Sequence, residues 1–113
     1  FRGFAQWSDA EGEAELPRLL AAAGVERFVV GHSVQEDRRI RVRFGGTVFL
    51  IDTGMLASYV PGGRASALEI GDGIVSAIYA GEPRVVIWQS ARRAAGISHP
   101  PGGAAAVLLT WSR

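Results

Sequence analysis

Apolar residues recur at helical spacing in the first part of the chain. Between residues 11 and 23 they occupy positions i, i+3, i+4 and i+7, which predicts an amphipathic helix. They are Leu16, Leu19, Leu20 and Ala23. Ser8 and Asp9 offer N-cap oxygens ahead of this helix, and Gly24 is a typical C-terminal stop. Because Pro17 fits only the first turn of a helix, we expect the regular part to begin near Leu16.

A short apolar strand follows the helix and ends in a histidine. Residues 27–31 are mostly apolar, and Gly31-His32 stands at their carboxyl end. A helix followed by a strand is typical of an α/β layer. We therefore expect an α/β fold in which the helix and two β-hairpins are built onto this strand.

The first hairpin is predicted directly after the His32 loop. Residues 38–43 alternate between basic and apolar, residues 47–52 are more apolar, and Gly45-Gly46 provides a tight turn between them. The loop that follows, residues 53–63, contains three glycines and one proline. It is too long to be a simple connection between two elements.

The second hairpin has the clearest turn. Residues 65–70 and 74–79 flank Asp72-Gly73, which is one of the stronger short-range hairpin signals. Residues 84–88 predict a further strand at the edge of this hairpin. The predicted order is therefore helix, strand, hairpin, hairpin.

The pattern loosens after this point. We assign residues 1–88 to one part of a domain and residues 89–113 to a loosely ordered tail or an edge strand. Residues 1–7 are rich in aromatic side chains, which is unusual at the start of a domain and indicates packing against something that precedes them. Because the first residue is not Met, we expect the chain to be the later part of a longer protein.

Composition narrows the classes of function. The hydrophobic share of 48% and the net charge of +1 describe an ordinary globular protein, so we expect no nucleic-acid partner. On a strand, Arg39, Arg41 and Arg43 would form one solvated basic face. No run approaches the roughly 18 apolar residues of a membrane span, so no membrane association is expected. The absence of cysteine excludes disulfides, thiolate metal sites and a cysteine nucleophile, but it does not fix the compartment.

His32 is the first residue that could carry chemistry. It stands at the end of a rigid strand, and neutral imidazole is the commonest side-chain ligand of metals. One histidine does not make a site, because catalytic zinc needs three protein ligands. His99, the other histidine, lies in a Pro-Gly loop without ligand spacing to His32. We therefore interpret His32 as one ligand of a metal site whose other ligands are outside this chain.

Asp52-Thr53-Gly54 offers an alternative chemistry. An Asp-Thr-Gly segment after an apolar strand is how an aspartic protease presents its catalytic carboxylate, and a retropepsin-like homodimer would use Asp52 in this way. A simpler interpretation is that the Asp52 side chain caps the turn that follows it. We favour the capping role, because no flap hairpin follows and the next strand ends in a hairpin turn.

A set of short segments in fixed order carries a resemblance to a known family. They are Val29-Val30-Gly31-His32-Ser33, Phe44-Gly45-Gly46, Phe49-Leu50-Ile51-Asp52-Thr53-Gly54-Met55, Tyr59, Gly62-Gly63 and Ala67-Leu68-Glu69-Ile70. In this order they resemble the C-terminal part of the catalytic domain of calcineurin-like metallophosphoesterases. The similarity is greatest to the bacterial phosphoprotein-phosphatase-like branch, which includes the Shewanella-like phosphatases. The resemblance implies the C-terminal portion of a β-sandwich flanked by helices.

The resemblance also implies a site. In that family a Gly-His at this place supplies a histidine to one metal of a dinuclear centre, which would make His32 a ligand of one of two divalent metal ions (Mn, Fe or Zn). Many relatives carry a second histidine two positions later, where this chain has Val34, and the phosphoprotein-phosphatase branch also lacks it. Arg2 and Tyr59 would contact the phosphate of the substrate.

The family segments that supply most metal ligands and the catalytic acid all precede this region and are absent from this chain. The leading hypothesis is therefore a metal-dependent phosphoesterase, of which this chain is a fragment without activity of its own. Its partners would be a phosphorylated substrate, either a phosphoprotein or a small phosphate ester, and the missing N-terminal half of the domain. The alternatives are the retropepsin-like protease and a non-catalytic β-rich scaffold.

Overall fold

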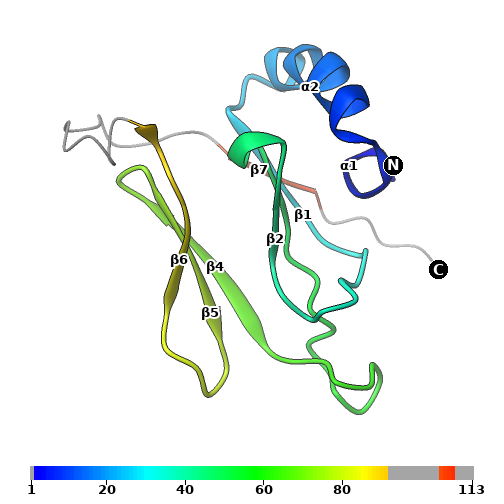
Figure 1. Ribbon diagram of the computed structural model, residues 1–113, viewed down its shortest axis with the longest axis vertical. Helices are drawn as coiled ribbons and strands as arrows, with labels where there is room; N and C mark the ends of the chain where they lie inside the picture. The colour runs from blue at the N-terminus through cyan, green and yellow to red at the C-terminus, as the bar shows by residue number, and fades with distance from the viewer. Residues whose placement is uncertain (1, 92–104, 109–113) are drawn as a thin grey trace.

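Two helices precede the first strand (Figure 1). The computed structural model describes residues 2–91 and 105–108; in it α1 spans Gly3–Gln6 and α2 spans Asp9–Ala23. Ser8 caps α2, because its hydroxyl oxygen accepts from the Glu11 backbone N–H and its own backbone N–H donates to the Glu11 carboxylate, at 3.3 and 2.8 Å. These bonds lower the pKa of Glu11. The predicted helix and its cap are confirmed, and the helix begins two residues earlier than expected.

The expectation that Pro17 limits the helix is wrong, because α2 runs through it without interruption. Pro17 has no N–H to donate to the carbonyl of Glu13, which costs helix stability. Both residues are exposed, so water can hydrate that carbonyl. The capping box at one end and the buried Leu16 next to the proline hold both halves of the helix in place.

Gly12 lies in the middle of α2 for a packing reason. Glycine is a poor helix residue, but a Cβ at this position would lie only 2.1 Å from the aromatic ring of Phe44. Phe44 begins a short 3-10 turn, Phe44–Gly46, in the first hairpin. The helix can therefore approach the first sheet only because Gly12 has no side chain.

The first sheet is mixed. It contains β1 (Arg27–Val30), β2 (Arg41–Arg43) and β3 (Val48–Leu50), with β7 (Ala105–Leu108) added beside β1. The order is β2-β3-β1-β7; β2 and β3 are the predicted hairpin, and β1 is parallel to both β3 and β7. The first hairpin is therefore built onto the His32 strand, as expected.

The second sheet is antiparallel and separate. It contains β4 (Ser66–Gly71), β5 (Ile74–Tyr79) and β6 (Val85–Gln89) in that order. The Asp72-Gly73 hairpin and the edge strand are confirmed. The expectation that both hairpins are built onto β1 is wrong for the second hairpin. The β4-β5 hairpin packs against the first sheet and does not extend it.

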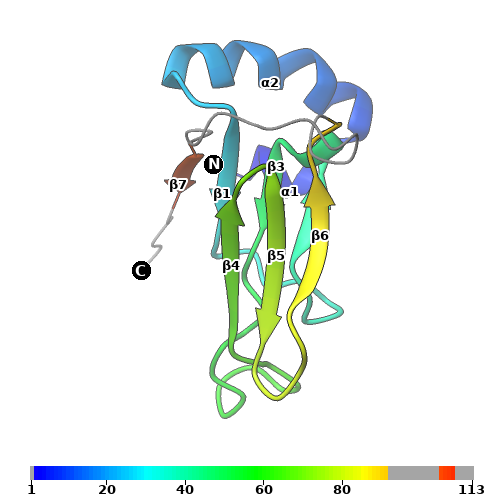
Figure 2. The same ribbon diagram turned by 90° about the vertical axis from the view of Figure 1, so that its left-hand side faces the viewer.

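The mixed sheet lies between the helices and the antiparallel sheet (Figure 1). Figure 2 looks onto the antiparallel sheet, with β4, β5 and β6 in front of the mixed sheet. On its helix side, Phe28, Val30, Val48 and Leu50 form a buried cluster with Phe4 of α1 and Leu16 of α2. On its other side a second cluster joins the two sheets; its buried members are Ile40, Ala77 and Tyr79. The molecule is thus a small α/β protein with three layers. No helix in the described part of the chain is long and apolar enough to cross a membrane.

The prediction that Arg39, Arg41 and Arg43 share one face is wrong for Arg39. Arg38 has φ +57, and this left-handed residue interrupts the alternation before β2 begins. Arg39 therefore turns to the second sheet, where its guanidinium lies 4.8 Å from the ring centroid of Tyr79. The two sheets are joined further by the Ile40 backbone N–H, which donates to the Tyr79 hydroxyl at 2.9 Å.

Candidate functional site at the ends of two parallel strands

His32 and Asp52 follow neighbouring parallel strands. Val30 of β1 stands opposite Leu50 of β3, and the Ile51 N–H donates to the Val30 carbonyl at 2.9 Å. Because the carboxyl ends of parallel strands meet at the same sheet edge, both residues leave the sheet side by side. This edge is where open α/β sheets usually bind ligands.

A hollow of about 410 Å³ opens at this edge, and we call it the strand-end hollow. It is lined by Gly31, His32, Val34, Ile51, Asp52, Gly54, Met55, Leu56, Tyr59 and Val60. It therefore brings together His32, Asp52 and Tyr59, which the sequence singled out for three separate reasons. Arg2 is not among its lining residues and precedes α1 instead.

His32 is exposed and has φ +74, a left-handed conformation that is uncommon outside glycine. The loop that follows it is fixed by Gln35, whose side chain is buried. The Gln35 backbone N–H donates to the Asp52 carbonyl at 2.9 Å, and its side-chain amide donates to the Ser33 carbonyl at 2.6 Å. An unfavourable backbone conformation that tertiary contacts maintain is typical of functional sites.

Asp52 caps its own turn. Its Oδ1 accepts a hydrogen bond from the backbone N–H of Gly54 at 3.0 Å, so the predicted capping interpretation is confirmed. The bond holds the start of the 53–63 loop and keeps the carboxylate at the wall of the hollow.

The base of the 53–63 loop is closed by contacts that the sequence did not reveal. Thr53 is fully buried; its hydroxyl donates to the Arg64 carbonyl at 2.7 Å and lies 2.7 Å from the Ser66 hydroxyl. The Arg64 N–H donates in return to the Thr53 carbonyl. A Cβ at Gly63 would lie 1.8 Å from the Gly54 carbonyl oxygen, so only glycine permits the loop ends to meet.

The outer part of the loop forms an apolar rim. Met55, Leu56 and Tyr59 are 60%, 68% and 88% exposed, and Val34 of the opposite loop is exposed as well. The Tyr59 N–H donates to the Leu56 carbonyl at 2.8 Å, which folds the rim into a compact turn. The hollow thus has polar groups at the strand ends and apolar side chains at its mouth.

The donors present fit part of a metal site. Within residues 2–91 and 105–108, no group of three or more His, Asp or Glu side chains could hold a metal ion. The strand-end hollow offers one imidazole and one carboxylate, fewer than the three protein ligands of a catalytic zinc site. A metal bound at His32 would therefore need ligands from outside these residues. His99 lies outside the described part of the chain.

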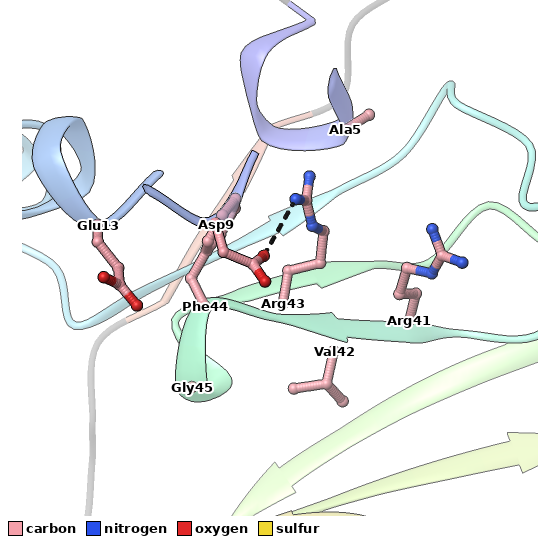
Figure 3. Close-up of a pocket in the computed structure, with 8 residues that line it drawn as sticks. All are labelled: Ala5, Asp9, Glu13, Arg41, Val42, Arg43, Phe44 and Gly45. Carbon is pink, nitrogen blue, oxygen red and sulfur yellow. Dashed lines mark ion pairs between the residues drawn. The ribbon is translucent and has the colours of Figure 1, made fainter. Parts of the chain in front are cut away.

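A second hollow, of about 540 Å³, lies between α2 and β2 (Figure 3), and we call it the helix hollow. Asp9, Glu13, Arg41 and Arg43 give it charged walls. The Arg43 guanidinium donates to the carbonyl of Phe4 at 2.9 Å and to that of Trp7, and lies 3.6 Å from the Asp9 carboxylate. Arg43 thus fastens the N-terminal segment to β2, and both of its terminal nitrogens are already bonded within the protein.

Comparison of the chain with protein-family models, with curated proteins and with solved structures found no match in any of the three. The assignment of a function therefore depends on the strand-end geometry and on the sequence segments described above.

Proposed function

We propose that the intact protein is a metal-dependent phosphoesterase and that this chain provides His32 to a dinuclear metal centre. The observation that carries the proposal is the position of His32 at the carboxyl end of β1, in one hollow with Asp52 and Tyr59. The resemblance of the same segments to calcineurin-like metallophosphoesterases supports it. The remaining ligands would come from residues outside this chain.

The arrangement of layers is compatible with this proposal. The protein has two packed sheets with helices on one side. We would expect this arrangement of the C-terminal portion of a metallophosphatase β-sandwich, which is flanked by helices. In that interpretation the mixed sheet presents His32, and the antiparallel sheet supports it from behind through the Ile40 and Tyr79 cluster.

Each residue of the hollow would have a separate task. Two divalent cations, when bound, supply a water of lowered pKa and offset charge on the phosphate oxygens. The His32 imidazole would bind one cation, and the exposed Tyr59 hydroxyl would donate a hydrogen bond to a phosphate oxygen of the substrate. Asp52 would keep the Tyr59 loop in place through its bond to Gly54. Arg2, which is exposed, would contribute to phosphate binding from a segment outside the hollow.

The test is the variant His32→Ala in the intact protein, with hydrolysis of a phosphate monoester followed in the presence of Mn²⁺. We expect activity to fall at least about 100-fold, because loss of a ligand costs no less than loss of a residue that supports one. His99→Ala is the matched control and should leave the activity unchanged. Unchanged activity in His32→Ala, or activity that chelators do not reduce, would contradict the proposal.

A further inference from the structure

Arg38 connects the two loops that form the strand-end hollow. Its Nε and Nη2 both donate to the carbonyl oxygen of Pro61, at 3.3 and 3.2 Å. Its Nη1 donates to the carbonyl oxygen of Gln35 at 2.7 Å. One guanidinium therefore bonds to the loop that follows His32 and to the loop that carries Tyr59.

The contact to Gln35 reaches the segment next to His32. Gln35 is buried, its side-chain amide donates to the Ser33 carbonyl at 2.6 Å, and its N–H donates to Asp52. On the other side, Pro61 is two residues from Tyr59 in the chain. Arg38 is thus connected through short paths to both sides of the opening between His32 and Tyr59.

The backbone of Arg38 indicates that its side chain maintains this arrangement. Arg38 has φ +57, which is unfavourable for a residue with a side chain, and its N–H donates to the Gln35 carbonyl at 3.0 Å. The guanidinium adds a bond to the same carbonyl and two bonds to Pro61. A planar fork of donors on a single carbonyl fixes direction as well as distance, which lysine cannot reproduce.

We propose that Arg38 is a positioning residue that holds the Tyr59 loop at a fixed distance from His32. Its effect on catalysis rests on the proposed phosphoesterase function; its hold on the loop does not. Thr53 and Arg64 close the base of the loop independently, so loss of Arg38 leaves the loop folded and releases only its outer part. Arg38 then acts on the substrate through Tyr59 and touches no reacting group.

The first measurement is amide hydrogen exchange in the intact protein. Arg38→Ala should accelerate exchange at residues 54–63 about tenfold, because hydrogen bonds from a charged group are among the stronger ones. Arg38→Gly relieves the left-handed backbone and should accelerate exchange equally. Arg41→Ala, which removes a nearby exposed arginine, should leave exchange in this loop unchanged. Unchanged exchange in Arg38→Ala, or wild-type exchange in Arg38→Gly, would overturn the proposal.

The second measurement is a double-mutant cycle on Mn²⁺-dependent hydrolysis of a phosphate monoester. Arg38→Ala and Tyr59→Phe should each lower kcat/KM, and the double variant should be only slightly worse than the more impaired single variant. Additive losses would show that Arg38 does not act through Tyr59 and would overturn its positioning role. A wild-type protein without metal-dependent hydrolysis would contradict the phosphoesterase proposal alone, since hydrogen exchange still tests the hold of Arg38 on the loop.

Discussion

The helix hollow and the strand-end hollow differ in where the fold places their polar side chains. In the helix hollow, which is the larger, both terminal nitrogens of Arg43 donate to carbonyls of the N-terminal segment, and its guanidinium lies 3.6 Å from the Asp9 carboxylate (Figure 3). In the strand-end hollow, the polar residues stand where two parallel strands end, behind an apolar rim. Volume and charge alone would favour the helix hollow as the functional site. The position of the polar residues favours the strand-end hollow, because open α/β sheets bind ligands outside the carboxyl ends of their strands.

The comparison is tested most strongly by Arg43→Ala. Removal of the guanidinium leaves the carbonyls of Phe4 and Trp7 without their donor and removes its contact with the Phe44 ring, 4.2 Å away. We expect the free energy of unfolding to fall by about 2 kcal/mol, with the proposed metal-dependent activity retained in the folded protein. Chemical denaturation measures this loss.

Arg41→Ala is the matched control for this variant. Arg41 lines the same hollow, but its guanidinium has no hydrogen bond or ion pair with any described residue, so its loss should change stability by less than about 0.5 kcal/mol. If Arg43→Ala abolished activity without loss of stability, the helix hollow would be the functional one and our comparison would be wrong.

Asp52 tests the chemistry of the strand-end hollow. Asp52→Ala should destabilise the protein by about 1 kcal/mol, because the Gly54 N–H loses its acceptor. Asp52→Asn retains an oxygen that can accept this bond and should retain most of the stability and activity. Thermal unfolding and phosphate release measure the two effects.

Asp37 provides a matched control, because its Oδ1 accepts from the Arg39 N–H at the same distance of 3.0 Å, outside the hollow. Asp37→Asn should behave like Asp52→Asn in stability. Loss of a peptidase activity in Asp52→Asn, but not in Asp37→Asn, would favour the aspartic protease alternative.

The smallest expected effect concerns Glu82, whose carboxylate pairs with two arginines outside the strand-end hollow. Arg39 follows the His32 loop, and Arg64 follows the 53–63 loop. The Glu82 carboxylate lies 3.2 Å from Arg39 and 2.8 Å from Arg64. The bond to Arg39 lowers the pKa of Glu82 below its ordinary value of 4.5, and Arg64 adds to the effect. The stabilisation is thus complete above the ordinary pKa and is lost as the pH falls through the lower pKa of the folded state.

Glu82→Gln removes this dependence. The melting temperature of the wild type should fall more steeply than that of Glu82→Gln between pH 6 and acidic pH, roughly 3. The difference should be slight, because the carboxylate is exposed to solvent and exposed ion pairs stabilise little. If the melting temperatures of the two proteins fell equally with pH, the pairing of Glu82 with Arg39 and Arg64 would not persist in solution.

Part of the candidate site could be predicted from the sequence. The apolar runs placed His32 and Asp52 at strand ends, and the Asp-Thr-Gly segment indicated the cap that Asp52 provides. The contacts of Arg38 and Thr53 could not be predicted. Arg38 bonds to Pro61, 23 residues away, and Thr53 bonds to Arg64, 11 residues away. No local pattern reports a hydrogen bond between two loops that meet only after the sheet has formed.

The sequence by itself determined the local elements of this protein. The N-cap at Ser8, the helix stop at Gly24 and the Asp72-Gly73 turn depend on neighbours within a few residues, and the sequence predicted each of them. Only the tertiary structure decided that β1 pairs in parallel with β3, that the second hairpin forms its own sheet, and that His32 and Tyr59 line one hollow. These features depend on contacts between segments that are distant in the chain. The burial of two apolar clusters stabilises those contacts. The periodicity of apolar residues does not encode them, because it reports only local structure.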